Sequence, residues 1–570
     1  MIDTFSVERS FLPRDLEVSN WEQVEKFFND LLGRDLANKS DLLKWLRDRS
    51  ELEAFLTEDF GWRYIRMSCD TANEDLSKAF NFFVTEIQPR IAPLSHQLDK
   101  QLLASAAVNE LSERSYFILL RQVKKRVEIF REENIPLISD LQQQEQEFSA
   151  ITGAMTIEMN GQEITLQQAG NYLEQTDRAL RESVFFKVNN RRLLDKDKLN
   201  DLLHSLIEKR SKVAANAGFS SYREYMFASL GRFDYTVEDC LQFHQSVEKL
   251  LVPLNNQVDE RHRNDLGLKE LRPWDSAASK PGQSPLKPCE SGSDLMEKTI
   301  ACFEEIDPFL GECMRAMRDA NRLDLESRKG KAPGGYNYPL YETGLPFIFM
   351  NSSNTLRDLV TMVHEGGHAV QSIVDIPLEL VDFKNIPSEV AELASMSMEL
   401  ISMEHWQHFF SNSDELKRAR RKHLEDVLKG LPWIACVDAF QHWLYTHPGH
   451  TSAQRNEAWV NCHQRFSGNT VDWSGLDDFR ENIWQKQLHI YEVPFYYIEY
   501  GFAQLGAIAM WKNYQQDPSG TIRKYIDALK MGYTASIGEI YERAGIRFDF
   551  SEDYVRELSD FVRDEWKKLL

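Results

Sequence analysis

The sequence lacks the features expected of a secreted, membrane-spanning or nucleic-acid-binding protein. No stretch of about 18 apolar residues occurs, which predicts that no helix spans a membrane. Residues 1–9 contain no basic segment followed by an apolar one, so we expect neither a signal peptide nor a transit peptide. The 67 Lys and Arg residues are outnumbered by 89 Asp and Glu residues, and the net charge of −22 disfavours binding to nucleic acid. Peptides, small molecules and cations remain as candidate partners.

Cysteine is scarce, and its spacing follows no known pairing pattern. The seven cysteines are Cys69, Cys240, Cys289, Cys302, Cys313, Cys436 and Cys462. None belongs to a C-x-x-C pair, which disfavours both a disulfide framework and a thiolate metal site. We therefore expect reduced, mostly buried thiols and a cytoplasmic protein.

Glycine and proline are also scarce, which favours long helices. The 27 Gly and 19 Pro residues make up about 8% of the chain, against about 12% in typical domains. Apolar residues recur at three- and four-residue steps in residues 110–134 and 199–215, which predicts helices there. Residues 155–166 differ, because two alternating segments flank Asn160-Gly161, the strongest short-range signal for a β-hairpin.

Turn-forming residues gather near the middle of the chain. Residues 263–293 are rich in Pro, Gly, Ser and Lys, which predicts a loop or hairpin excursion. Residues 331–336 interrupt the helical pattern again, and the apolar residues 345–350 that follow predict a short strand. Helical periodicity then resumes and continues to Leu570. The expected fold class is mostly α, with a few short strands near the centre of the chain.

Residues 364–368 read His-Glu-Gly-Gly-His, which is the H-E-x-x-H pattern. Residues four apart on a helix lie on one face, so His364 and His368 can bind one zinc ion while Glu365 addresses its water. The preceding residues support a helix, because Thr355 and Asp358 can form an N-terminal cap. The pattern predicts a zinc site on an amphipathic helix.

The two glycines inside this predicted helix need an explanation. Gly366 and Gly367 each cost about 1 kcal/mol of helix stability relative to alanine. Close packing of another backbone, or room for a substrate, would explain why they are present.

Two glutamates downstream are candidates for a third zinc ligand, which a hydrolytic site needs beside an open fourth position. Glu389 and Glu392 lie on the next predicted helix, residues 387–399, and either can fold back toward the histidines. Spacing alone does not choose between them. Glu392 and Glu399 are seven residues apart and share a helix face, so one can bind zinc while the other accepts a hydrogen bond from a ligand imidazole.

Together these motifs resemble the thimet oligopeptidase and oligoendopeptidase F family of zinc metallopeptidases, most closely its bacterial oligoendopeptidase F branch. The resemblance rests on residues 364–368, on residues 392–395 with Glu399, on residues 331–336 followed by 346–349, and on the aromatic run at 489–500. It extends from about residue 110 to residue 570.

The resemblance implies a mostly α, two-lobed zinc metallopeptidase with a deep central channel and a small β-sheet beside the active-site helix. It implies one zinc ion per chain, with Glu392 as the third ligand and Glu399 as the residue that orients a zinc histidine. We expect the strand at 345–350 to be an edge strand, whose free backbone groups can pair with an extended peptide. The substrate-contacting residues implied are Gly334, Gly335, Tyr336, Phe347 and Phe349.

We also expect two regions of the chain. The first is an N-terminal helical region, residues 1–190, with the hairpin near 155–166. The second is the catalytic zinc metallopeptidase domain, residues 191–570.

A histidine and tyrosines that bind the oxyanion are a further implication of the resemblance. His489 fits this role, together with tyrosines of the aromatic run. Tyr500 can share a helix face with either Tyr496 or Tyr497, so spacing alone leaves the pair open. The family's tyrosines are three residues apart, which favours Tyr497 with Tyr500.

These implications predict a zinc-dependent oligoendopeptidase that hydrolyses internal bonds of short peptides with a zinc-activated water. Glu365 would take a proton from the water and return it to the leaving amine. Two alternatives stay open: an exopeptidase of the dipeptidyl carboxypeptidase type, and a non-catalytic peptide-binding protein on the same fold. Glu365 counts against the second, because binding alone does not need it. The sequence does not predict an oligomeric state.

Overall fold

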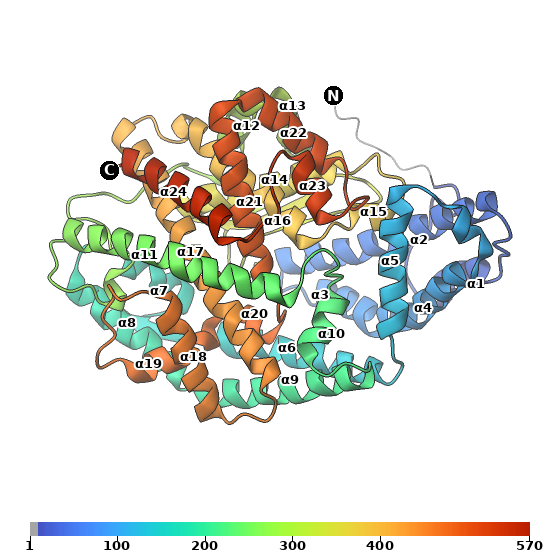
Figure 1. Ribbon diagram of the computed structural model, residues 1–570, viewed down its shortest axis with the longest axis horizontal. Coiled ribbons are helices and arrows are strands. Elements are labelled where there is room, and N and C mark those ends of the chain that lie inside the picture. Colours follow the sequence, from blue (N-terminus) through green and yellow to red (C-terminus); the bar gives the residue numbers. More distant parts are fainter. Residues whose placement is uncertain (1–8) are drawn as a thin grey trace. The chain divides into compact units, whose positions relative to one another are not determined.

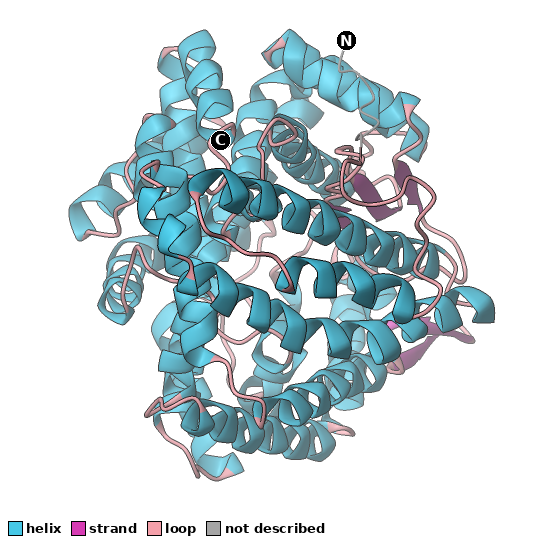
Figure 2. Ribbon diagram, turned by 90° about the vertical axis from the view of Figure 1, so that its right-hand side faces the viewer, coloured by secondary structure: helices cyan, strands magenta, loops and turns pink. Residues whose placement is uncertain are grey.

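The computed structural model describes residues 9–570, and most of these residues are helical (Figure 1, Figure 2). The expected fold class, mostly α with a few short strands, is confirmed. Residues 1–8, which carried most of the expectation about signal and transit peptides, lie outside the described residues. No helix between residues 9 and 570 is long and apolar enough to cross a membrane.

The chain forms two compact units, each built from three separate stretches of sequence. Unit 1 comprises Met1–Glu128, Leu286–Arg420 and Phe502–Phe548. Unit 2 comprises Ile129–Pro285, Arg421–Gly501 and Asp549–Leu570. The division expected at residue 190 stays a prediction, because compactness does not decide which segment carries an activity.

Unit 1 contains the N-terminal helices, a small sheet and the helices that follow it. Its elements are α1 (Glu22–Leu32), α2 (Lys39–Cys69), α3 (Glu74–Phe82), η1 (Phe83–Ile87), α4 (Gln88–Ala104), η2 (Ala106–Glu110), α12 (Gly292–Ile306), α13 (Pro308–Asp319), β3 (Leu323–Glu326), β4 (Tyr336–Tyr338), β5 (Phe347–Ser352), α14 (Leu356–Val374), α15 (Val381–Lys384), α16 (Ser388–Ser402), η4 (Met403–His408), α22 (Pro518–Leu529) and α23 (Ile537–Arg543). Helices α5 (Arg114–Ile129), α17 (Ser413–Thr446) and α21 (Tyr497–Gln516) have residues in both units.

Unit 2 is helical apart from one hairpin. Its elements are α6 (Asn134–Gly153), β1 (Thr156–Met159), β2 (Gln162–Thr165), α7 (Leu166–Leu173), α8 (Arg178–Leu193), α9 (Lys196–Asn216), α10 (Tyr222–Ser229), α11 (Val237–Asp265), η3 (Pro273–Asp275), α18 (Ser452–Phe466), α19 (Asp477–Asn482), η5 (Ile483–Lys486), α20 (Leu488–Tyr491) and α24 (Glu552–Lys568).

Most local predictions agree with these elements. The helix expected over 199–215 lies within α9. Between the end of α11 at Asp265 and the start of α12 at Gly292 the chain forms loops with a short 3-10 turn and an isolated bridge from Leu271 to Val471. The single helix expected over 110–134 is wrong, because α5 ends at Ile129 and α6 begins at Asn134. Pro136 explains the break: in a continuous helix its ring would clash with the carbonyl of Glu132, whereas the first turn of a new helix tolerates it.

The predicted hairpin is present in unit 2. Strands β1 and β2 pair antiparallel, with Met159 opposite Gln162. Asn160 and Gly161 both adopt positive φ, at 53° and 76°, as the tight turn between right-twisted strands requires.

The second sheet lies in unit 1 and has the strand order β3-β5-β4. Strand β5 pairs in parallel with β3 on one side and antiparallel with β4 on the other. The expectation that the strand at 345–350 is an edge strand is therefore wrong. Its apolar sequence already fits a central position, since a strand buried on both faces is apolar throughout. The edge beside it is β4.

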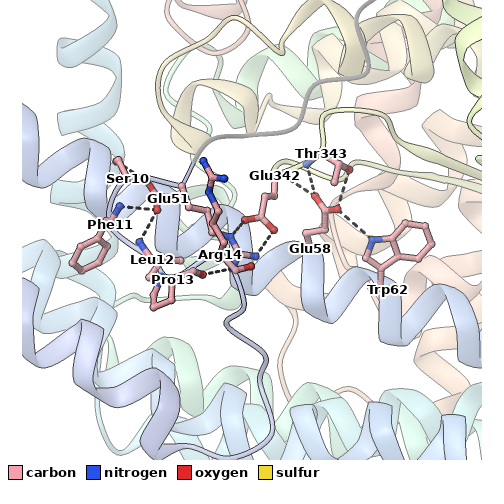
Figure 3. Close-up of polar contacts among 11 residues, drawn as sticks. Ser10, Phe11, Leu12, Pro13, Arg14, Glu51, Glu58, Trp62, Glu342 and Thr343 are labelled. Carbon is pink, nitrogen blue, oxygen red and sulfur yellow. Dashed lines mark hydrogen bonds and ion pairs between the residues drawn. The ribbon is translucent and has the colours of Figure 1, made fainter.

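One buried carboxylate fastens the sheet region to α2. Glu58 is 4% exposed and accepts hydrogen bonds from the backbone N–H groups of Glu342 and Thr343, both at 2.8 Å. The hydroxyl of Thr343 donates to it at 2.9 Å and the indole of Trp62 at 3.2 Å (Figure 3). Glu58 thus anchors the loop before β5 to α2.

Replacing Glu58 by alanine is expected to lower the free energy of unfolding of unit 1 by about 3 kcal/mol, because buried donors lose a charged acceptor. Urea unfolding followed by circular dichroism measures the change. The control is Glu74→Ala, whose side chain is 87% exposed and whose loss should change stability by less than about 0.5 kcal/mol. Equal effects of the two substitutions would contradict a fastening role for Glu58.

Candidate metal centre

Helix α14 carries the H-E-x-x-H residues and begins at the predicted cap. The Asp358 carboxylate accepts hydrogen bonds from the backbone N–H and hydroxyl of Thr355, at 2.7 and 2.8 Å. The helix then runs from Leu356 to Val374 without interruption. Its apolar side, including Leu359, Val363 and Val370, is fully buried. The capped amphipathic helix predicted from the sequence is confirmed.

The glycines of α14 allow close packing against its neighbours. A Cβ atom at Gly367 would lie 2.6 Å from Ser395 Cα and 2.7 Å from the carbonyl oxygen of Ala394, both backbone atoms of α16. At Gly366 a Cβ atom would lie 2.9 Å from the ring of Phe303. From the sequence we expected these glycines to allow either close packing of another backbone or room for a substrate. Close packing of another backbone is confirmed for Gly367.

Substituting Gly367 by alanine should therefore separate α14 from α16. The overpacking is expected to cost about 1–3 kcal/mol of stability and to weaken zinc binding, since residues of both helices meet at the centre. Metal titration and thermal unfolding test this. Gly430→Ala in α17 is the matched control: nothing lies within 4 Å of the added Cβ, and alanine should stabilise that helix by up to about 1 kcal/mol. Tighter zinc binding by the Gly367 variant would contradict the packing argument.

Three side chains of α14 and α16 converge in unit 1. Donor atoms of His364, His368 and Glu392 all lie within 4.8 Å of one another. Glu392 Oε2 is 3.5 Å from His364 Nε2 and 3.8 Å from His368 Nε2. Among residues 9–570, Glu389 belongs to no such group, although α16 also buries it. The structure thus separates the two glutamates that spacing left open.

The donor set fits zinc. Zinc takes imidazole nitrogen and carboxylate oxygen at about 2.0–2.2 Å, which places tetrahedral ligands roughly 3.3–3.6 Å apart. The separations of 3.5 and 3.8 Å between Glu392 and the two rings lie close to that range. Three protein ligands leave a fourth position for a water molecule or a substrate.

Glu399 orients one of the two rings. Its Oε1 lies 2.6 Å from His364 Nδ1, so the ring donates its Nδ1 proton there and turns Nε2 toward Glu392. Burial lowers the pKa of His364, but the carboxylates of Glu399, Glu392 and Glu365 outweigh it and raise the pKa to about 10. Burial lowers the pKa of His368 well below its usual value, and the charge of His364 adds to this effect.

Glu365 is 7% exposed and lies between the two histidines in sequence. Burial raises the pKa of Glu365 to about 7; the charge of His364 opposes the shift and that of Glu392 supports it. The side chain of Asn337, from β4, donates to the backbone carbonyl of Glu365 at 3.5 Å. This contact was not predicted, and its only sequence signal is a polar residue between two tyrosines in the short strand.

The expected substrate-contacting residues divide into two groups. Phe347 and Phe349 lie on the central strand, are 7% and 0% exposed and pack with Ile65 and Leu340, and their contact with substrate stays a prediction. Gly334, Gly335 and Tyr336 lead into the edge strand β4 and are more accessible. Strand β4, the edge of the sheet, contacts α14.

His489 and the tyrosines cluster within unit 2. The ring centroid of His489 lies 4.6 Å from that of Tyr497, 5.8 Å from that of Tyr500 and 6.2 Å from that of Tyr496. Phe495 turns the chain between α20 and α21 with a positive φ of 69°, a strained conformation for a bulky residue. The turn brings residues on both sides of it together.

A glutamine fixes the ring of His489. Gln487 Nε2 donates to His489 Nδ1 at 2.8 Å, while Trp433 donates to the oxygen of the same amide at 3.1 Å. Burial lowers the pKa of His489 to about 4, so at neutral pH the ring is neutral and carries its proton on Nε2. Burial raises the pKa of Tyr497 to about 12, which keeps its hydroxyl a donor. Gln487 was not predicted, and its position two residues before His489 gave no signal.

Two family models match the chain. The model described as Peptidase family M3 matches residues 171–560, and the one described as Peptidase M3 N-terminal domain matches residues 11–130.

Individual proteins support the same relationship. Oligopeptidase PepF of Bacillus subtilis (strain 168) is 25% identical over 428 residues, which cover 72% of this chain and 61% of PepF. The plasmid-encoded oligoendopeptidase F of Lactococcus lactis subsp. cremoris is 24% identical over 309 residues, which cover 53% of this chain and 50% of that protein. The chain thus spans about half to three-fifths of the length of these relatives.

Solved structures match over the whole chain. PZ peptidase A with inhibitor 2 has a TM-score of 0.90 and 26% identity, covering 100% of this chain and 99% of the other. A putative oligoendopeptidase F also has a TM-score of 0.90 and 26% identity, covering 98% and 99%.

Proposed function

The chain belongs to peptidase family M3, and we propose that it is a zinc-dependent oligoendopeptidase, which hydrolyses internal bonds of short peptides. The observation that carries the proposal is the convergence of His364, His368 and Glu392, with Glu365 buried on the helix of the two histidines. Oligoendopeptidase F and PepF proteins among the relatives support the substrate class.

His364, His368 and Glu392 would hold one zinc ion per chain. When bound, zinc supplies Lewis-acid polarisation of a carbonyl group and of a water molecule. Glu399 keeps the proton of His364 on Nδ1, which leaves Nε2 as the donor atom.

Glu365 acts as the general base and then as the general acid. Its carboxylate takes a proton from the attacking water and returns it to the leaving amine, so one group serves both halves of the reaction. Burial suits it to this task, because a carboxyl group with a pKa of about 7 both accepts and releases a proton near neutral pH.

His489, Tyr497 and Tyr500 are proposed to donate hydrogen bonds to the oxyanion of the tetrahedral intermediate. Their clustering within unit 2 and the protonated state of the Tyr497 hydroxyl support this role. Each such donor contributes about 10²- to 10³-fold to the rate in comparable sites.

The edge strand β4, with Gly334, Gly335 and Tyr336 before and at its start, is proposed to hold an extended peptide by backbone pairing. The channel that would exclude folded proteins and a cytoplasmic location stay predictions. So do the two alternatives, an exopeptidase and a peptide-binding protein without catalysis.

A quenched fluorescent peptide blocked at both termini tests the proposal. We expect hydrolysis at an internal bond, loss of hydrolysis after zinc is removed with a chelator, and recovery when zinc is added back. Mass spectrometry of the products locates the cleaved bond.

The same peptide with a free C-terminus is the control. An exopeptidase of the dipeptidyl carboxypeptidase type would cleave only this free form and release dipeptides. A binding protein would retain the peptide in equilibrium dialysis without cleaving it, and either outcome would contradict the proposed endopeptidase.

A further inference from the structure

Unit 2 buries a second group of side chains of the types that bind metal ions. Cys240 and His244 are four residues apart on α11, and Asp438 and His442 are four residues apart on α17. Because residues at this spacing share a helix face, each helix presents a pair of donors. Their exposed fractions are 0%, 1%, 0% and 6%.

Three of the four side chains are close enough to share one ion. Donor atoms of Cys240, Asp438 and His442 all lie within 4.8 Å of one another. Asp438 Oδ2 is 3.2 Å from His442 Nε2, so the carboxylate and this ring are in direct contact.

His244 contacts the same carboxylate oxygen. Its Nε2 lies 2.8 Å from Asp438 Oδ2, the distance of a hydrogen bond, which leaves the second oxygen of Asp438 for another partner. This is the arrangement by which an outer histidine or carboxylate fixes a metal ligand in other sites.

Several polar atoms of the cluster have no hydrogen bond to satisfy them. Asp438 Oδ1 and His442 Nδ1 make none, and the one polar contact of His442 Nε2 is the ion pair with Asp438 Oδ2. Aromatic rings surround them: Phe227 and Phe495 lie 6.3 and 5.4 Å from the ring of His442. Apolar neighbours cannot replace the missing partners, whereas a bound cation would accept lone pairs from both groups.

We propose that unit 2 holds a second divalent transition-metal ion, of the zinc class, between α11 and α17. Cys240 Sγ, Asp438 Oδ1 and a ring nitrogen of His442 are its ligands, and His244 positions Asp438. Binding releases the thiol proton of Cys240 to solvent, and the thiolate and carboxylate together balance the charge of the ion. Thiolate, imidazole and carboxylate are all ligands that zinc accepts.

The site does not depend on the proposed peptidase function, and its ligands differ from those of the first centre. It departs from the expectation that none of the cysteines binds metal. That expectation rested on the absence of C-x-x-C pairs, whereas here one ligand comes from α11 and two come from α17, about 200 residues later in the chain.

Cobalt substitution tests the proposal, because only a thiolate ligand gives an intense sulfur-to-cobalt charge-transfer band. The full chain, freed of metal and reloaded with Co²⁺, should show this band and bind about two ions per chain. Cys240→Ser should lose the band and bind about one ion. Cys436→Ser, at a cysteine of α17 that is 2% exposed, is the matched control and should keep both.

Two further variants keep the test decisive if Cys240→Ser does not fold. Glu392→Gln should lose the first ion and keep the band, and Asp438→Asn should keep the first ion and weaken the band. Absence of the band from the unchanged protein, or its persistence in Cys240→Ser, would overturn the proposal whether or not the chain hydrolyses peptides.

Discussion

Glutamine at position 365 is expected to lower kcat for peptide hydrolysis by about 10²- to 10⁴-fold, because an amide cannot take the proton of the attacking water. The substitution keeps the size of the side chain and removes no proposed ligand. Zinc content should therefore stay at the level of the unchanged protein. Hydrolysis of the blocked fluorescent peptide and elemental analysis of the same samples measure the two quantities.

Glu399→Gln is the informative comparison for this variant. Glu399 contacts His364, so its loss should weaken zinc binding by about 10- to 100-fold and leave an activity that excess zinc restores. Excess zinc should not restore the Glu365 variant. If Glu365→Gln hydrolysed the peptide at the normal rate, another group would have to be the base.

The local parts of the centre were predictable because they depend on short-range rules. The period of the helix places His364 and His368 on one face, and the cap at Thr355 fixes where that helix begins. The two glycines also indicated close packing, since residues that weaken a helix need a compensating contact. Gly367 provides it by allowing the backbone of α16 to approach.

Features that depend on long-range packing were less accessible from the sequence. The order β3-β5-β4 is set by pairing between strands whose sequences contain no marker of their neighbours, so the edge was assigned to the wrong strand. The cluster of Cys240, Asp438 and His442 needs α11 and α17 side by side. In each case the sequence contains the residue types, but it does not indicate which distant segments pack against them.

The choice between Glu389 and Glu392 also depends on packing, through the rotation of α16 about its axis. The hydroxyl of Tyr525 donates to the carbonyl of Ala394 at 2.9 Å, and that of Tyr541 to the carbonyl of Glu389 at 3.0 Å. Together with the contact at Gly367, these bonds hold α16 so that Glu392 faces the histidines.

Replacing Glu392 by glutamine is therefore expected to remove most of the zinc. The rate of hydrolysis should then fall by more than about 10³-fold, because the loss of a single transition-state contact already costs about 10²- to 10³-fold. Glu389→Gln is the control, because it replaces another buried carboxylate of α16, three residues earlier, and should retain the metal. Any general effect of burying an amide should appear in both variants. Zinc titration and peptide hydrolysis distinguish them. Loss of zinc from the Glu389 variant with retention in the Glu392 variant would reverse the assignment of the third ligand.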